Sequence, residues 1–207
     1  MTDKPAVQQY HDHLLGNAAL DQLFREARSY NGWLQKDVSE EQIRSIYDLL
    51  KMGPTSANMQ PSRFVWCQSI EAKERLAAYA IDSNKDKVRT APVCVVIGFD
   101  IDFHEQLPWL FPHTDAKAWF EGDEEGRVES ARRNSALQGA YLMVAARALG
   151  LDCGPMSGVD LEGVTREFFA DQPRVRADWI CSLGYGDPDS IFERSPRPEF
   201  ERFNRIA

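Results

Sequence analysis

The sequence predicts an α+β protein in which long helices surround one modest sheet. Several segments carry apolar residues at helical spacing, and short runs rich in β-forming residues lie between them. Ala91–Phe99 (APVCVVIGF) is apolar throughout, which is typical of a central strand covered on both faces. The 207 residues fit one domain or a tight pair of domains, and such a chain can bury a core without disulfides or metals.

Two helices are predicted before the first strand. Leu14–Arg28 has apolar residues near helical spacing. A second helix begins at Ser39, which can cap its N-terminus, and Gln42 three residues later completes a capping-box pattern. Gly53 and Pro54 end this helix, and the loop PTSANMQPS that follows has no periodic pattern.

The rest of the chain alternates between strand-like and helix-like segments. In order, we expect a strand at Arg63–Gln68, a helix at Ile70–Ile81, the strand Ala91–Phe99, a helix at Arg127–Leu149 with Gly150 as its C-cap, a strand at Leu151–Cys153, a helix at Leu161–Phe169 and a strand at Trp179–Tyr185. The second half of the long helix is apolar nearly all round, so we expect it to be buried.

Two segments have no regular pattern. Asp100–Glu125 is a long irregular insertion, which is more often a functional lid or an interface than an idle loop. The tail from Asp187 to Ala207 contains three prolines and is predicted to be extended. It carries five hydrophobic anchors, and we therefore expect it to wrap something, such as a second subunit; the anchors are Ile191, Phe192, Phe200, Phe203 and Ile206.

The composition excludes several classes of protein. With 24 Lys+Arg against 32 Asp+Glu, the formal net charge is −8, which argues against nucleic-acid binding and against adhesion to anionic membranes. No apolar run approaches the roughly 20 residues of a membrane span, and residues 1–15 lack the apolar region of a signal peptide. Cysteines 67, 94, 153 and 181 lie far apart in apolar stretches, which indicates buried reduced thiols and a cytoplasmic protein.

Several common catalytic motifs are absent. The sequence has no GxGxxG after a strand and no GxxxxGK[ST], which counts against a Rossmann NAD site and a P-loop. It has no HExxH and no Cys/His cluster at ligand spacing, so we expect no metal site. GxSxG is also absent, which argues against a serine hydrolase elbow.

Three polar clusters remain, at Arg28–Asn31, Pro54–Pro61 and Glu193–Pro198. Taken singly, they fit a helix cap, a turn and a solvated tail. Together they offer guanidinium, hydroxyl and amide groups suited to a phosphate and a polar heterocycle. A fourth segment, Leu149–Gly158, contains a Gly/Pro turn whose backbone N–H groups could face a ligand.

The order of these pieces resembles the FMN-dependent nitroreductase family. Pro54–Pro61 resembles the family loop P-S-S-x-N-x-Q-P, and Ala148–Gly158 resembles A-L-G-L-x-x-x-P-x-x-G. Gly184–Gly186 resembles a late strand that ends in G-Y-G, and the similarity extends from about residue 20 to 198. The stretch EARSYNGW and the loop are most similar to the malonic semialdehyde reductase branch.

The resemblance implies a fold and an activity. It implies a single FMN-binding domain over residues 1–207, with a mostly antiparallel sheet surrounded by helices, in an intertwined homodimer. FMN would accept hydride at N5 from NADH or NADPH in a ping-pong cycle and pass it to a small electron-poor acceptor. That acceptor would be a nitro compound, a quinone or a short semialdehyde such as malonic semialdehyde. The alternative is a flavin-binding or storage protein that keeps the fold but has no efficient turnover.

The resemblance also assigns cofactor-binding residues, with no side chain as acid or base. Arg28 and Ser29 would contact the phosphate or ribityl chain, and Arg194 and Arg197 would clamp the phosphate. The flavin ring would be contacted by three groups: Pro54, Thr55, Ser56 and Asn58 from the partner subunit, Asn84 and Lys87 at the pyrimidine edge, and the backbone of Pro155, Met156, Ser157 and Gly158 near N5.

The chain departs from the family pattern at its N-terminal phosphate motif. The family's RRSxR start has basic residues on both sides of the serine-containing core, and Ala27 and Asn31 occupy two of those places here. Ser157 stands where other members carry Glu, which is tolerable because only its backbone N–H is needed.

Overall fold

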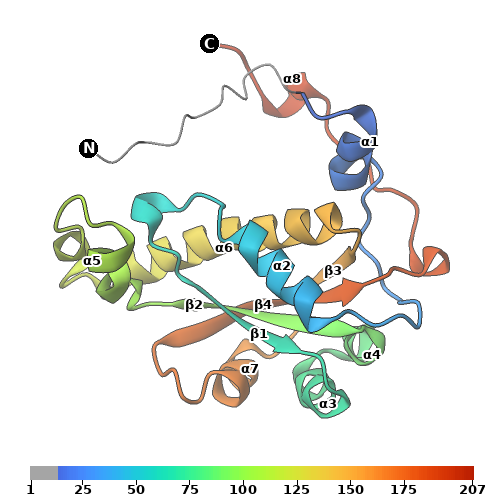
Figure 1. Cartoon of the computed structure of the whole chain (residues 1–207), viewed down its shortest axis with the longest axis horizontal. Coiled ribbons are helices and arrows are strands. Elements are labelled where there is room, and N and C mark those ends of the chain that lie inside the picture. The colour runs from blue at the N-terminus through green and yellow to red at the C-terminus, as the bar shows by residue number, and fades with distance from the viewer. Residues whose placement is uncertain (1–13) are drawn as a thin grey trace.

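The computed structural model describes residues 14–207, and its strands form one four-stranded sheet (Figure 1). In chain order the strands are β1 (Ser62–Cys67), β2 (Val93–Asp100), β3 (Asp152–Met156) and β4 (Val175–Gly184), and their order in the sheet is β1-β2-β4-β3. All three ladders are antiparallel, as the resemblance implied. β4 begins four residues before the expected Trp179, because Val175 and Ala177 pair with the end of β2 and are buried.

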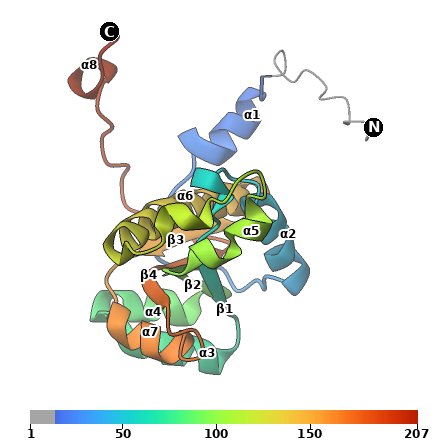
Figure 2. The ribbon, with the colours of Figure 1, turned by 90° about the vertical axis from the view of Figure 1, so that its left-hand side faces the viewer.

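Helices cover both faces of this sheet (Figures 1 and 2). The helices are α1 (Asn17–Leu20), α2 (Glu40–Leu50), α3 (Ile70–Tyr79), α4 (Asp82–Thr90), α5 (Leu107–Leu110), α6 (Glu124–Ala148), α7 (Leu161–Phe168) and α8 (Phe200–Phe203). α2 and α6 lie on one face, and α3, α4 and α7 lie on the other. The α+β prediction is therefore confirmed for residues 14–207.

The position of β2 inside the sheet explains why its sequence is apolar throughout. Every residue from Val93 to Phe99 is buried, because neighbouring strands flank β2 and helices cover both of its faces. Val93, Val95 and Ile97 belong to the core beneath α2 and α6, whereas Cys94 and Val96 belong to the core beneath α3 and α7. The prediction of a doubly covered strand is confirmed.

The start of α2 follows the predicted capping box. The backbone N–H of Gln42 donates to Ser39 Oγ at 3.3 Å, and the backbone N–H of Ser39 donates to Gln42 Oε1 at 3.0 Å. Both orphan donors at the helix start are thus satisfied by two side chains.

One helix was not predicted, and the burial of another was overestimated. α4 (Asp82–Thr90) occupies a charged stretch in which no element was expected; it buries only Asn84 and Val88, so the sequence shows no apolar stripe there. The second half of α6 was expected to be buried, but Leu137 and Tyr141 are exposed. Within one chain, only the side of α6 that faces the sheet and α2 is covered.

The insertion Asp100–Glu125 is more ordered than the sequence suggests. It contains 3₁₀ turns at Phe103–Gln106 and Lys117–Phe120 with α5 between them. Phe103, Leu107 and Met59 are buried in a small core at this end of the sheet. The insertion is therefore packed onto the body, while Trp109 on α5 remains 76% exposed.

The tail is mostly extended, as predicted, with short helical turns at Pro188–Ser190 and α8. Its aromatic anchors are exposed in the single chain, with Phe192 80% and Phe203 70% accessible. The tail and α1 both project from the α6 side of the body (Figures 1 and 2).

Among residues 14–207, no helix has the length and hydrophobicity needed to cross a bilayer. The expectation that no signal peptide is present concerns residues 1–15, of which 1–13 lie outside the described residues.

The four cysteines are free and buried, which confirms the prediction of buried thiols. Burial raises the pKa of both Cys67 and Cys94 to about 12, so their reactive thiolate forms are scarce at neutral pH. We expect the native protein to show almost no reaction with a thiol reagent such as DTNB within minutes at pH 8. All four thiols should react once the protein is unfolded in guanidinium chloride, and rapid native labelling at Cys67 or Cys94 would contradict this.

Candidate functional site

A cavity of about 570 Å³ brings together two of the polar clusters that the sequence singled out. We call it the arginine pocket; its lining residues are Phe24, Arg25, Ala27, Arg28, Ser29, Arg147, Phe192, Glu193, Arg194, Ser195 and Arg197. They come from the segment after α1, from the last turn of α6 and from the tail. Arg28 and Ser29 thus lie beside Arg194 and Arg197, although more than 160 residues separate them in the sequence.

Hydrogen bonds to backbone carbonyls hold the pocket segments together. The backbone N–H of Tyr30 donates to the carbonyl of Cys153 in β3 at 3.0 Å, which docks the N-terminal segment on the sheet edge. Across the pocket, Arg28 donates to the carbonyl of Phe192, and Arg194 donates to the carbonyl of Ala27 at 3.1 Å. The segment after α1 and the tail are therefore joined by Arg28 and Arg194, two of the side chains expected to contact a phosphate.

The charge of the arginine pocket is not neutralised by carboxylates. Arg25 pairs with Asp21 at 2.6 Å, but the other four arginines form no ion pair among residues 14–207; these are Arg28, Arg147, Arg194 and Arg197. Glu193 is the acidic residue in the lining. The protein as a whole carries a net charge of −8, whereas this cavity is locally positive. Unpaired guanidinium groups gathered at one cavity suit the binding of a phosphate monoester.

Sequence reasoning missed Arg147, which lies in a helix noted for its apolar residues. Arg25, inside the first predicted helix, also lines the cavity, but its guanidinium is paired with Asp21. The only available signal for Arg147 was a lone cation in the last turn of α6, and such a residue commonly serves the helix C-terminus.

Asp152 and Tyr30, which interact electrostatically with Arg147 and Arg28, have shifted pKa values. Burial raises the pKa of Asp152, while a hydrogen bond from the backbone N–H of Gly186 at 2.9 Å and attraction to Arg147 act in the opposite direction. Burial and the nearby Asp152 raise the pKa of Tyr30, and Arg28 acts to lower it. Tyr30 is therefore neutral at physiological pH.

The loop expected to contact the flavin is held in an unusual backbone conformation. Ala57, Asn58 and Gln60 have φ values of 48°, 49° and 41°, which L-residues rarely adopt. Hydrogen bonds fix the loop: the N–H of Ser56 donates to Asn134 Oδ1 at 2.8 Å, and Asn58 Nδ2 donates to the carbonyl of Leu110 at 2.9 Å. Such strain is retained where the surroundings determine the conformation, as at ligand sites.

This loop borders a second cavity of about 360 Å³, the loop pocket. Its lining includes Asn58, Gln60, Gln138 of α6 and Trp109 of α5. Pro54, Thr55 and Ser56 are in the same loop but do not line this cavity; Thr55 Oγ1 accepts a hydrogen bond from the N–H of Gln60 at 3.2 Å. The loop pocket places the 100–125 insertion beside the loop.

Within one chain the loop and the arginine pocket lie far apart. The loop is bonded to Asn134, and the arginine pocket includes Arg147, thirteen residues further along α6. At about 1.5 Å per residue this separates them by roughly 20 Å along the helix. The two sets of residues assigned to FMN therefore do not meet inside a single chain.

Asn84, expected at the pyrimidine edge of the flavin, and Gly158, expected near N5, are in contact. Asn84 Nδ2 donates to the carbonyl of Gly158 at 3.2 Å, and the N–H of Ile81 donates to the same oxygen at 3.1 Å. Lys87 is half-buried and forms no ion pair within the described residues. Its carbonyl accepts hydrogen bonds from Trp33 Nε1 at 3.2 Å and from Ser182 Oγ at 3.1 Å, which fixes this turn of α4 on the core.

The predicted Gly/Pro turn is partly wrong. Pro155 and Met156 belong to β3, because they pair with Cys181 and Ile180 of β4. The chain leaves the sheet only at Ser157 and Gly158. Pro155 and Ser157 are nevertheless exposed and remain available to a ligand.

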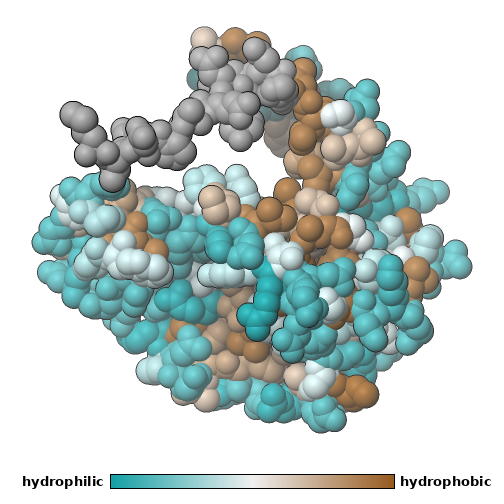
Figure 3. All heavy atoms as spheres, viewed as in Figure 1, coloured by the Kyte–Doolittle hydropathy of each residue, from teal (hydrophilic) through white to brown (hydrophobic). Residues whose placement is uncertain are grey.

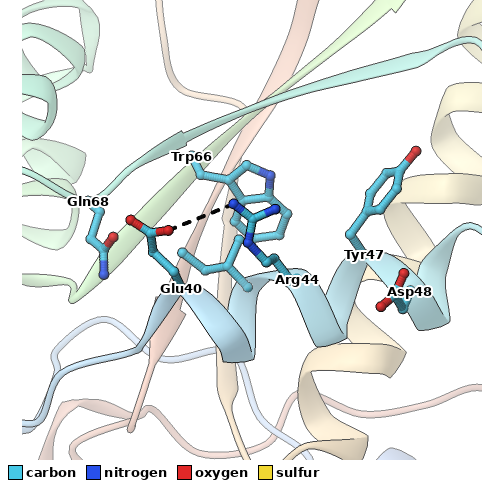
Figure 4. A pocket seen from close by; sticks show the side chains of 7 residues that line it. Glu40, Arg44, Tyr47, Asp48, Trp66 and Gln68 are labelled. Atoms are coloured by element: carbon cyan, nitrogen blue, oxygen red, sulfur yellow. Dashed lines mark ion pairs between the residues drawn. The ribbon is translucent and has the colours of Figure 1, made fainter.

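A further cavity of about 480 Å³ lies between α2 and β1 (Figure 4). It contains none of the residues that the sequence singled out, and its one arginine, Arg44, pairs with Glu40 at 3.8 Å. Because its charged side chains are paired, it offers a weaker phosphate site than the arginine pocket. In the described part of the chain no group of three His, Cys, Asp or Glu residues is placed to hold a metal ion.

Known proteins resemble this chain in sequence and in fold. Residues 25–186 match the model of the Nitroreductase family. A protein of Stenotrophomonas maltophilia strain R551-3, named "Putative NADH dehydrogenase/NAD(P)H nitroreductase", is 56% identical over 195 residues, or 94% of this chain and 99% of the relative. A protein of the same name from Xanthomonas oryzae pv. oryzae is 52% identical over 192 residues, or 93% of this chain and 97% of the relative.

Solved structures share the fold. A nitroreductase family protein from Streptococcus pneumoniae has a TM-score of 0.78 at 21% identity, covering 90% of this chain and 98% of the other. A "putative nitroreductase in complex with FMN" from Exiguobacterium sibiricum has a TM-score of 0.81 at 21% identity, covering 94% of this chain and 99% of the other.

Proposed function

The chain belongs to the nitroreductase family, and from this premise we propose that it is an FMN-dependent NAD(P)H oxidoreductase that reduces a small electron-poor acceptor. The observation that carries the proposal is the arginine pocket, where four guanidinium groups without carboxylate partners surround one cavity. The buried Nε of Arg147 has no hydrogen-bond partner within the described residues, which fits a site that completes its contacts with an anion.

The residues of this chain would hold FMN at three places. Arg28, Ser29, Arg194 and Arg197 would bind the phosphate in the arginine pocket. Asn84 and Lys87 would face the pyrimidine edge of the ring, and the backbone from Pro155 to Gly158 would face N5. When bound, FMN supplies hydride transfer from NADH or NADPH to the acceptor.

Lys87 would contribute electrostatics rather than proton transfer. Its side chain is half-buried and forms no ion pair among residues 14–207, so its positive charge is only partly screened. A fixed positive charge of this kind favours the reduced, more negative form of a nearby flavin.

The proposed acceptor is a nitro compound, a quinone or a short semialdehyde such as malonic semialdehyde. The names of the relatives support a nitro compound. The branch resemblance of EARSYNGW and the PTSANMQP loop supports the semialdehyde. The loop pocket beside Trp109 is the part of the chain that would border such an acceptor.

Anaerobic spectroscopy of the flavin-loaded protein tests this function. We expect NADH or NADPH to bleach the FMN absorbance near 450 nm. Adding p-benzoquinone, nitrofurazone or malonic semialdehyde should then restore it, with steady turnover. Bleaching without acceptor-driven recovery would support the flavin-binding or storage alternative, and a protein that binds no FMN would contradict both.

We also propose a homodimer with two FMN sites at its interface. The loop and the arginine pocket lie roughly 20 Å apart along α6, so a second chain is needed to supply the loop. Large hydrophobic side chains are exposed near the loop and on α6, including Met52 (75%), Leu137 and Tyr141. Figure 3 shows hydrophobic atoms gathered on the upper surface, above α2 and beneath α1; surfaces of this kind mark interfaces.

The oligomeric state checks this proposal directly. Multi-angle light scattering of the flavin-loaded protein at micromolar concentration should give twice the chain mass of 23.5 kDa. A flavin-loaded monomer would contradict the shared site.

A further inference from the structure

We propose that Arg147 is an additional phosphate-binding residue and replaces the basic residues that the family motif has at positions 27 and 31. The inference rests on the proposed FMN function. Ala27 and Asn31 cannot supply the missing charge, and Asn31 is already engaged, because its Nδ2 donates to the carbonyl of Ser190 at 2.9 Å. Arg147 lines the same pocket from a different element, the last turn of α6.

The hydrogen bonds of Arg147 leave two nitrogens of its guanidinium group, Nε and Nη2, without a partner within residues 14–207. Nη1 donates to the carbonyl of Leu23 at 3.3 Å. Nε is buried and has no partner within residues 14–207. Nε and Nη2 form the edge of a guanidinium that binds two oxygens of a phosphate or carboxylate in parallel. An unsatisfied buried donor is costly, so a ligand oxygen at this edge would stabilise the site.

Arg25 lines the same pocket but is not available in this way. Its Nε pairs with Asp21 at 2.6 Å, and its Nη2 donates to the carbonyl and side-chain oxygens of Asn17 at 3.0 and 3.1 Å. Arg25 therefore has its charge paired and its Nε and Nη2 engaged by residues 17 and 21, and it serves as a matched comparison for Arg147.

A purely structural role for the Arg147 side chain would change flavin affinity in a different way from a phosphate contact. Its backbone carbonyl accepts a hydrogen bond from Gln22 Nε2 at 2.6 Å, so this region also docks the segment after α1 on α6. If the side chain only supported that docking, its loss would weaken every flavin equally. A phosphate contact is lost only for the ligand that carries a phosphate, which separates FMN from riboflavin.

The test measures dissociation constants of apoprotein for FMN and for riboflavin by quenching of flavin fluorescence. We expect Arg147→Gln to weaken FMN binding by about 10- to 100-fold, the range of a lost charge-assisted contact. Riboflavin binding should change by less than about threefold. Arg147→Lys should give a smaller loss for FMN, since an ammonium keeps the charge but cannot bind in a fork. Arg25→Gln should change FMN affinity by less than about threefold.

Unchanged FMN affinity in both Arg147 variants, or equal losses for FMN and riboflavin, would overturn the role of Arg147. A parent protein that binds FMN no better than riboflavin would instead contradict the phosphate site itself, and a parent that binds neither would contradict the proposed function and this inference together. If Arg147→Gln fails to fold by circular dichroism, the comparison of FMN with riboflavin in Arg147→Lys decides.

Discussion

Replacing Arg194 and Arg197 together by alanine is expected to strip FMN from the protein during purification. Each residue lines the arginine pocket without a carboxylate partner among residues 14–207. A charge-assisted contact contributes about 1.5–3 kcal/mol, so each single variant should lose about 10- to 150-fold in FMN affinity. The double variant should lose more, although the two losses need not add, because both residues act on one phosphate. Fluorescence titration of the apoproteins measures these changes.

Chemistry should be affected less than binding in these variants. At FMN concentrations that saturate the site, the rate of flavin reduction by NAD(P)H should stay within a few-fold of the parent. Arg202→Ala is the matched control, because Arg202 lies in the same tail within α8, outside the arginine pocket. Unchanged FMN affinity in both single variants, or an equal loss in Arg202→Ala, would place the phosphate elsewhere.

Lys87→Ala is expected to lower the midpoint potential of bound FMN by tens of millivolts. A cation near the N1–O2 edge stabilises the anionic reduced flavin, and its effect is larger in a partly dry site. For a two-electron couple, 30 mV corresponds to about 1.4 kcal/mol, which is the scale of a partly screened charge. Reduction by NAD(P)H should slow while FMN occupancy stays near that of the parent. An anaerobic redox titration against an indicator dye measures the potential.

Lys85→Ala provides the control on the same helix. Lys85 is already paired with Asp82 at 2.7 Å, so its charge is compensated locally. We expect its removal to leave the midpoint potential within a few millivolts of the parent. Equal potentials for Lys87→Ala and the parent would remove Lys87 from the flavin site.

The sequence predicts those elements whose patterns are local. The capping box at Ser39 and the apolar run of β2 depend on neighbouring residues, and both appear as expected. α4 was missed because tertiary packing stabilises it: Val88 is its one buried apolar side chain, and the rest is polar or exposed. β4 was predicted too short because its start is defined by pairing with β2 rather than by its own composition.

In the candidate site, too, some residues were predicted from the sequence and others are brought together only by the fold. The resemblance to the family groups Arg28 with Arg194 and Arg197, and the structure brings these residues to one cavity. Arg147 could not be found in this way, because nothing in its helix marks it and only the fold places it beside the tail. The contribution proposed for the 54–58 loop depends on a second chain, and a single chain does not bring the loop to the arginine pocket.

A crystal structure of the protein grown with FMN tests the central claim most directly, because it locates the phosphate and the ring at once. We expect a dimer with the phosphate in the arginine pocket, contacted by Arg28, Arg147, Arg194 and Arg197. The ring should lie beside Asn84, Lys87 and Gly158, with Ser56 and Asn58 of the other chain against it. A phosphate bound outside the arginine pocket, or a flavin ring contacted by residues of one chain only, would contradict it.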